Sequence, residues 1–425
     1  MKLRTCYIPL VALVAAAGCA SPTAPSAAPP SSSVPPSSSV PPSSSVPSSA
    51  HAGSSPAAPA SQSLVTNPKQ IGSPAVVSSP ADASQPQAYV TAAQLLNPND
   101  GAVVVKDCPA QGSCAFRVDV TSDGGATWRR GQDFVIADAA DNGSANMEDP
   151  VIGITMLSAS DMYVYGSSVW HTTDADATWA QLPGAPAVDD MAINNGELWA
   201  MVACADLSRC SSSIDVISSG RITTLPHQPG GLIGSIVREG HNAYAVLRDA
   251  GGVGALAVSH NDGDSWQQRA LPQPYCTFSL GPGMTITSTG ELFVVCAGGA
   301  GVGNEPKDLF VSDDGALSWR HLGSLETYGY ADGIIAATPD ILWRYGGRSP
   351  VYSSTDAGRT WHTQLDDNVG DGAGPMTQAV VAAGTTALVF AFGLPPDPTF
   401  TGPWTINEYR TTDAGASWQT RPLQP

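Results

Sequence analysis

The chain has few positive charges. Lysine and arginine together number 19, against 37 aspartates and glutamates, and the net charge is −18 at pH 7. Such an acidic surface disfavours nucleic acids and anionic lipid head groups, because both are held by basic side chains. Acidity also keeps an exported surface soluble, which explains most of the charge without a specific partner. We therefore expect no nucleic-acid partner.

Three further patterns are missing. No CxxC or HxxxH spacing accompanies the cysteines, so we expect no metal site and no cofactor. No long segment repeats its apolar residues every 3.6 positions, which argues against a helical domain. The longest apolar run after the N-terminus, Ala379–Leu394, is interrupted by Gly384, Thr385 and Thr386. That run predicts two strands around a turn rather than a membrane span.

The first residues are typical of an export signal. Lys2 and Arg4 precede the apolar stretch Tyr7–Ala17, and the sequence Ala-Ala-Gly-Cys at 16–19 resembles a bacterial lipobox. The resemblance implies that residues 1–18 are removed and that Cys19 is lipidated. The protein would then be held on the extracellular face of the bacterial cytoplasmic membrane by its lipid alone. Because the motif usually has Leu where this chain has Ala16, plain or partial secretion is the alternative.

Residues 19–85 have a composition that cannot bury a core. They are mostly Pro, Ser and Ala, and the hexapeptide Pro-Pro-Ser-Ser-Ser-Val occurs three times, at 29–34, 35–40 and 41–46. We expect a disordered or polyproline-II linker. Roughly 65 residues at about 3.1 Å each would reach about 200 Å when fully extended. The folded domain is therefore predicted to cover residues 86–425 and to stand well away from its anchor.

That domain carries six copies of one eight-residue motif, Ser/Thr-x-Asp-x-Gly-x-Ser/Thr-Trp. Three copies are complete, at 121–128, 354–361 and 411–418. In the others Asp176 or Ala316 replaces the glycine, or Asn261 replaces the aspartate. The key positions are Asp123, Trp128, Asp174, Trp179, Asn261, Trp266, Asp314, Trp319, Asp356, Trp361, Asp413 and Trp418.

The motif has the chemistry of a tight turn. The Asp and Ser/Thr oxygens can accept hydrogen bonds from N–H groups of their own turn, and glycine allows a positive φ. The tryptophan supplies an apolar anchor where the next strand begins. Residues before each motif alternate in polarity, as in Phe116–Val120. Each motif therefore predicts a turn between antiparallel strands, and its aspartate is interpreted as structural rather than catalytic.

The motif resembles the Asp-box, or BNR repeat, of sialidase-like β-propellers. The resemblance implies an all-β fold of four-stranded antiparallel blades arranged as a monomeric ring. In that superfamily the boxes lie on the outer rim, away from the active site. The seven-unit layout also resembles propellers that serve as photosystem-assembly and stability factors.

Spacing indicates seven blades rather than six. Successive motif tryptophans are 51, 87, 53, 42 and 57 residues apart, and the 87 suggests one hidden repeat. Cys108 and Cys114 recur at Cys204 and Cys210 with a common offset of 96, which places a degenerate motif at 217–224. Seven units over residues 88–425 give about 48 residues each, which suits a four-stranded blade. We predict a complete blade over about 186–228.

The cysteines of the domain form local pairs. In an exported protein the pairs predict disulfides Cys108–Cys114, Cys204–Cys210 and Cys276–Cys296. Six cysteines allow fifteen connectivities, and short loops favour the local one because their closure costs the least entropy. Metal binding is the rival interpretation.

The loops that enter the first strands form the usual ligand face of a propeller. Here they are acidic and aromatic, and their candidate ligand-binding residues are Glu148, Asp149, Asp189, Asp190, Tyr328, Tyr330, Asp332 and Asp371. We hypothesise a binding module or scaffold for a protein or glycan ligand. The alternative is a glycoside hydrolase of the xyloglucanase-like or sialidase-like type, with Asp149, Asp190 and Asp332 as candidate catalytic carboxyls. Solvated loop residues with no function are the third interpretation.

The sialidase version of that alternative is disfavoured. Sialidases hold the substrate carboxylate with three arginines, and their Arg-Ile-Pro signature is absent here. The best arginines available are Arg238, Arg344 and Arg348, two of which fall in one repeat. We therefore expect the repeat without the sialidase chemistry.

Overall fold

The computed structural model describes the chain over a series of segments. These are residues 87–108, 115–134, 151–202, 212–249, 252–272, 276, 283–298, 305–325, 333–346, 349–365, 377–392 and 406–423. Within them the structure contains strands and turns, with no helix long and apolar enough to cross a membrane.

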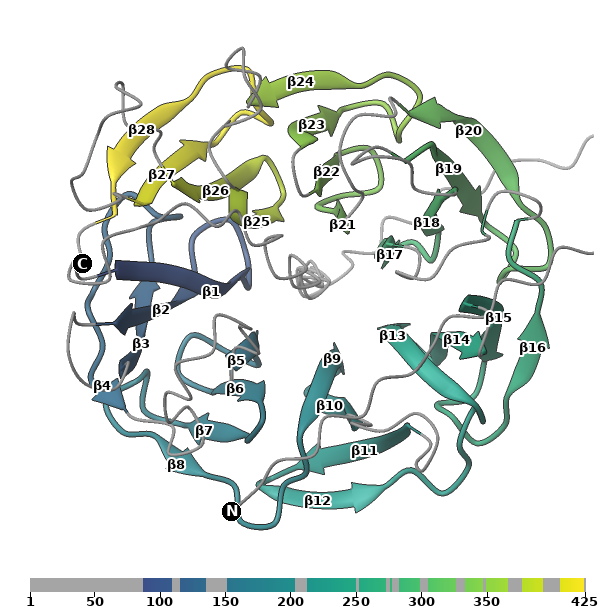
Figure 1. Cartoon of the computed structure of the whole chain (residues 1–425), viewed down its shortest axis with the longest axis horizontal. Helices are drawn as coiled ribbons and strands as arrows, with labels where there is room; N and C mark the ends of the chain where they lie inside the picture. Colours follow the sequence, from purple (N-terminus) through teal and green to yellow (C-terminus); the bar gives the residue numbers. More distant parts are fainter. Residues whose placement is uncertain are drawn as a thin grey trace, which may run out of the picture. The chain divides into compact units, whose positions relative to one another are not determined.

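Seven sheets of four antiparallel strands make up the fold, and each sheet is one blade of a β-propeller (Figure 1). Every blade uses four strands that are consecutive in the sequence. The predicted all-β, seven-bladed propeller is therefore confirmed.

The strands of the first four blades are as follows. Blade 1 has β1 (Gln87–Leu95), β2 (Gly101–Cys108), β3 (Ala115–Thr121) and β4 (Asp133–Phe134). Blade 2 has β5 (Val151–Met156), β6 (Met162–Gly166), β7 (Trp170–Thr172) and β8 (Ala180–Gln181). Blade 3 has β9 (Val188–Asn194), β10 (Glu197–Val202), β11 (Ser213–Ser218) and β12 (Arg221–Thr224). Blade 4 has β13 (Leu232–Glu239), β14 (Asn242–Asp249), β15 (Gly252–Ser259) and β16 (Gln267–Arg269).

The remaining three blades complete the ring. Blade 5 has β17 (Gly283–Ile286), β18 (Leu292–Ala297), β19 (Lys307–Ser312) and β20 (Arg320–Leu325). Blade 6 has β21 (Gly333–Ala336), β22 (Leu342–Gly346), β23 (Ser349–Ser354) and β24 (His362–Leu365). Blade 7 has β25 (Thr377–Ala383), β26 (Thr386–Phe392), β27 (Ile406–Thr411) and β28 (Gln419–Pro422).

The core is divided into layers between neighbouring blades. One apolar cluster joins blade 1 to blade 7 through Leu95, Val103 and Phe390, all of which are fully buried. Trp199 and Trp343 lie fully buried in two other clusters of this kind. Such residues alternate along their strands, so each blade presents one apolar face to each neighbour. These two tryptophans therefore belong to the core between blades.

Blade 3 is the hidden repeat. Its four strands fall within 186–228, and the turn at Ser219 and Gly220 has positive φ angles of 50° and 72°. Leu225 is buried, and its N–H donates to the carbonyl of Ile214 (2.9 Å), as the N–H groups of Leu182 and Leu423 donate to carbonyls at the start of the third strands of blades 2 and 7. The side-chain amide of Gln228 donates hydrogen bonds to the carbonyls of Ile214 (3.0 Å) and Leu225 (2.7 Å). Blade 3 thus keeps the strand pairing of the other blades although its turn lacks the Asp and Trp of the motif.

All six motifs lie at the turn between the third and fourth strands of their blades. In blade 1, Asp123 accepts hydrogen bonds from the N–H (2.7 Å) and hydroxyl (2.7 Å) of Thr127 and from the hydroxyl of Thr121 (2.8 Å). Hydrogen bonds of this kind lower the pKa to about 2 at four other aspartates, Asp174, Asp314, Asp356 and Asp413. These carboxylates therefore stabilise their own turns, which is the structural role that the sequence predicts.

Among the described strands, each of the two blades that meet where the ring closes is made of its own four consecutive strands. The first strands contact one another in chain order, and β1 contacts both β5 and β25. β1 belongs to the first blade of the described chain and β28 to the last, and within the described residues blades 7 and 1 pack against each other without sharing a strand. Side chains must therefore supply what a shared strand would otherwise provide.

A cluster of charged residues from blade 7 makes hydrogen bonds to the motif turn of blade 1. Arg410 donates from Nε to the carbonyl of Gly124 (2.6 Å), and Arg421 donates to the carbonyls of Gly125 and Ala126. The Oε2 atom of Glu408, a fully buried residue, accepts from Arg421 Nη2 (2.8 Å) and from Trp128 Nε1 (2.7 Å). We call the side chains of Glu408, Arg410 and Arg421 the seam clasp.

Candidate functional site

The antiparallel topology gives the propeller two distinct faces. The first strands of all blades begin on one face, which we call the entry face. The turns between third and fourth strands, and therefore all six motifs, lie on the opposite face, which we call the motif face. Asp189 and Asp190, near the start of β9, belong to the entry face.

The structure describes two of the eight predicted ligand-binding residues. Asp189 and Asp190 lie near the start of β9, at a bulge in the pairing of β9 with β10. The other six predicted residues lie outside the described part of the chain: Glu148, Asp149, Tyr328, Tyr330, Asp332 and Asp371.

Asp190 has a structural role. Its Oδ1 atom accepts a hydrogen bond from the N–H of Met191 (2.9 Å), and its Oδ2 atom accepts one from the N–H of Ile236 (3.2 Å). Ile236 lies on β13, so the carboxylate joins blades 3 and 4. Both oxygens already carry a backbone hydrogen bond, which makes Asp190 a poor candidate for acid–base catalysis.

Asp189 is the chemically available carboxyl of the pair. The side chain is exposed, yet removal of water by surrounding protein raises its pKa, and the nearby Arg248 opposes that shift. Desolvation raises the pKa of a carboxyl because the charged form loses water, so protein surrounds part of the Asp189 side chain. Within the described residues, Arg248 is the cation whose charge acts on it.

Arg248 is a site residue that the sequence reasoning missed. It lies on β14 of blade 4, and its Nε atom is 2.4 Å from where a Cβ on Gly234 would lie. Glycine at 234 therefore leaves the space that the guanidinium occupies. Burial lowers the pKa of Arg248, and Asp189 opposes this. The packing of β9 against β13 and the pairing of β13 with β14 bring the two residues near each other, so sequence spacing carries no signal for it.

The arginines considered for a sialidase-like site have other roles. Arg238 lies against the ring of Trp199 (3.7 Å) and donates to Glu197 Oε1 (3.1 Å) and to Asp262 Oδ1 (3.4 Å). Arg344 is buried and lies over the ring of Tyr352, 4.4 Å from its centre. Arg348 is outside the described residues. Arg238 is thus packed between blades 3 and 4, and Arg344 is packed within blade 6.

Among the cysteines, Cys276 and Cys296 form a disulfide across 20 residues of sequence. Both are buried in the core between blades 4 and 5. The side chains of the other two predicted pairs, Cys108–Cys114 and Cys204–Cys210, lie outside the described part of the structure, as does Cys19.

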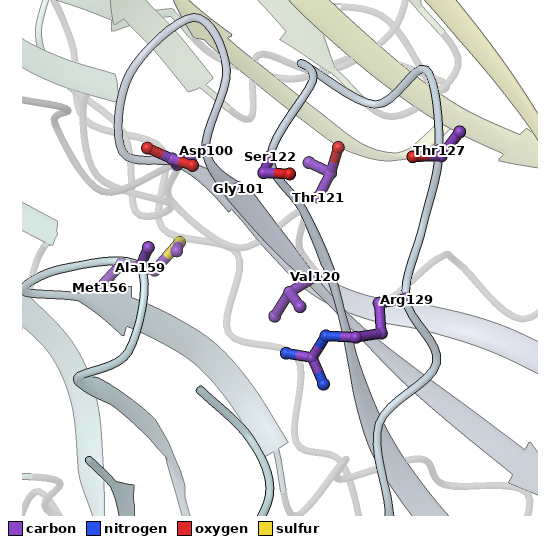
Figure 2. A pocket seen from close by; sticks show the side chains of 9 residues that line it. All are labelled: Asp100, Gly101, Val120, Thr121, Ser122, Thr127, Arg129, Met156 and Ala159. Atoms are coloured by element: carbon purple, nitrogen blue, oxygen red, sulfur yellow. The ribbon is translucent and has the colours of Figure 1, made fainter. Parts of the chain in front are cut away.

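A second candidate site lies on the motif face, between blades 1 and 2. It is a half-open cavity of about 230 Å³ beside the motif of blade 1 and the turn between β5 and β6 (Figure 2). Its lining includes the polar side chains of Asp100, Ser122 and Arg129 and the apolar side chains of Val120 and Met156. We call it the blade 1–2 crevice.

Comparison with known proteins identifies the fold. No protein-family model matches the chain, and no curated protein sequence matches it. Among solved structures, an ancestral GH74 enzyme is 13% identical with a TM-score of 0.54, over 84% of this chain and 48% of that enzyme. A puromycin-hydrolyzing peptidase of Mycobacterium tuberculosis is 14% identical with a TM-score of 0.50, over 84% of this chain and 55% of its own.

A third match is YCF48 bound to D1 peptide, with 16% identity and a TM-score of 0.47, over 75% of this chain and 96% of that chain. At these identities the resemblance establishes architecture alone, so function has to be argued from the residues of this chain.

Proposed function

We propose that this protein is a cell-envelope lipoprotein whose propeller binds a protein ligand on its entry face. The observation that carries the proposal is the Asp189–Arg248 pair: the exposed Asp189 on β9 and Arg248 on β14 belong to neighbouring blades, and the charge of each shifts the pKa of the other. Charge pairs of this kind select partners and orient them, because a ligand must match both signs. Export and lipidation at Cys19 complete the proposal and rest on the sequence of the first 19 residues.

The geometry of the two adjacent carboxyls supports binding over hydrolysis. Glycosidases need two carboxyl groups that face one cleft, roughly 5–10 Å apart. Asp190 is tied to the N–H groups of Met191 and Ile236, which leaves Asp189 without a catalytic partner within the described part of β9. A carboxyl beside an arginine can bind one basic and one acidic group of a ligand. It lacks the second carboxyl that cleavage of a glycosidic bond requires.

Ligand capture by entry-face variants tests the proposal. Immobilised protein is incubated with envelope extract and cross-linked, and the captured proteins are identified. Asp189→Asn and Arg248→Gln should each reduce capture of the specific ligand by about tenfold, the effect of losing one charge-assisted contact of about 1.4 kcal/mol.

Asp264→Asn is the matched control. Asp264 is an exposed aspartate in the blade 4 motif, so its replacement makes the same charge change on the opposite face. Equal capture by all four proteins would refute the entry face as the binding surface. Release of reducing sugar from xyloglucan by the wild-type protein would favour the hydrolase instead.

Fractionation of source cells tests the anchor separately. Cys19→Ala should move the protein from the membrane to the soluble fraction, because the acyl chains are attached to that one residue. Membrane association that survives the substitution would contradict the lipoprotein assignment and leave the ligand assignment untouched.

A further inference from the structure

The blade 1–2 crevice is separate from the entry face and has hydrogen-bonding groups to offer. Asp100 uses Oδ2 to accept from the side-chain amide of Asn97 (2.8 Å), and its Oδ1 has no partner among the described residues. The Ser122 hydroxyl likewise has no partner there. Arg129 uses two of its five N–H groups, which leaves three for a ligand.

These groups are held in place before any ligand arrives. Arg129 donates from Nη1 to Asp176 Oδ1 (2.6 Å) and from Nη2 to the carbonyl of Ala175 (2.6 Å). Asp100 is tied to Asn97 through both its N–H (2.9 Å) and its carboxylate. Ser122 is part of the motif turn that Asp123 organises. A polar site built on such fixed supports costs little ordering when it binds.

Size and charge restrict the occupant. The cavity of about 230 Å³ lies below the range of roughly 300–1,000 Å³ that is typical of drug-sized ligands, so it fits about one ring. Figure 2 shows the guanidinium of Arg129 below Val120, with Asp100 and Ser122 at the far end of the group. Arg129 is already paired with Asp176, and Asp100 adds a negative charge, so an anionic ligand is disfavoured.

We propose that the blade 1–2 crevice binds a single neutral sugar residue. A pyranose has adjacent hydroxyls that each donate and accept, and these match the Asp100 acceptor, the Arg129 donors and the Ser122 hydroxyl. Its C–H face can lie against the Val120 and Met156 side chains, which supply the apolar contact. The proposal is independent of the protein ligand on the entry face.

Saturation-transfer difference NMR on the full propeller provides the test. The probes are methyl β-glucopyranoside, methyl α-mannopyranoside and glucuronic acid, and the expected dissociation constant for a neutral probe is in the millimolar range. Ser122→Leu fills the crevice and should weaken binding at least tenfold. Arg129→Ala should do the same by removing the donors.

Two matched variants complete the design. Thr355→Leu changes the equivalent exposed motif position in blade 6, and Asp189→Asn alters the entry face. Both should bind the neutral probe as the wild type does, with unchanged thermal unfolding in Ser122→Leu and Thr355→Leu. The proposal is overturned by absence of saturable binding of either neutral probe, by unchanged binding in Ser122→Leu, or by tighter binding of glucuronic acid.

Discussion

Two interfaces between neighbouring blades, blade 1 with blade 2 and blade 7 with blade 1, are held by different numbers of charged side chains. Between blades 1 and 2 the chain itself runs from one blade to the next, and one arginine, Arg129, holds the following motif turn. Blades 7 and 1 are the last and first blades of the described chain, and the seam clasp makes several hydrogen bonds from one to the motif turn of the other. The comparison teaches that side chains replace covalent continuity at the closing seam.

Close packing at the closing seam depends on glycine. A Cβ on Gly125, whose φ is 85°, would lie 2.7 Å from Glu408 Oε1 and 2.8 Å from Leu388. The complete motif is therefore needed in blade 1. In blade 2 the same position holds Asp176, whose carboxylate receives Arg129 and whose φ of 73° is strained. The departure of this motif from the consensus is thus explained by the ion pair that it forms.

Removal of the buried carboxylate at the closing seam should have the largest effect. Glu408→Ala leaves Arg421 and Trp128 without their acceptor, and breaking a buried charge pair in this way costs about 3–5 kcal/mol. Glu408→Gln keeps the shape and should cost less. Urea unfolding followed by tryptophan fluorescence measures both. A loss no larger than that of Asp176→Ala would contradict the special role of this seam.

Truncation of the arginine should give the next largest loss. Arg421→Ala removes the donors to the carbonyls of Gly125 and Ala126 and the ion pair with the buried Glu408 carboxylate. We expect the free energy of unfolding to fall by about 1.5–3 kcal/mol. A double variant with Glu408→Ala should lose less than the sum of the single losses, because the two residues act on each other. Strict additivity in that cycle would show that the clasp is not a unit.

Substitutions at the interface of blades 1 and 2 should cost less stability than those at the closing seam. Asp176→Ala keeps a strained positive φ and loses the ion pair to Arg129, with an expected cost of about 1–2 kcal/mol. Asp176→Gly relieves the strain and restores the consensus, so its stability should lie within about 1 kcal/mol of wild type. Thermal unfolding of the pair checks the difference. A Gly variant less stable than the Ala variant would refute the strain argument.

Lowering the pH should gradually reduce the stability that the aspartate motifs contribute and should leave the contribution of the asparagine motif unchanged. Hydrogen bonds hold the pKa of Asp356 at about 2, below its ordinary value of 3.8, so its contribution to stability is complete above about pH 4. The contribution is lost as pH falls from 4 toward 2, because the carboxyl then takes up a proton in the folded state. Melting temperature measured across this range should therefore fall.

Asn261 shows how the dependence on pH can be removed. It accepts hydrogen bonds from Ser259 Oγ (2.9 Å) and from the N–H of Ser265 (3.0 Å), as an aspartate does, without a titrating proton. Asp356→Asn should unfold at nearly the wild-type temperature at pH 7 and show a smaller acid loss between pH 4 and 2. An unchanged slope with pH would rule out this aspartate as a contributor.

Much of the fold could be read from local sequence because each motif satisfies its own hydrogen bonds. Thr121, Asp123 and Thr127 lie within seven residues and bond to one another, so their spacing reports a turn wherever it occurs. Blade 3, the hidden repeat, was also predictable, because Cys204 and Cys210 keep the register of Cys108 and Cys114. The candidate site was less predictable. Asp189 was found as an acidic loop residue, whereas Arg248 lies 59 positions away and was missed.

By itself, the sequence determined the strand–turn repeats, the number of blades and the structural role of the motif aspartates, because these depend on bonds within a few residues. Tertiary structure alone decided how the ring closes, which carboxyl of Asp189 and Asp190 is available, and where Arg248 and Arg129 meet their partners. Those features join different blades, and contacts between blades depend on how sheets pack around the ring. Pairings that form only through packing leave no fixed spacing in the chain, since the partners are brought together by geometry rather than by distance along the sequence.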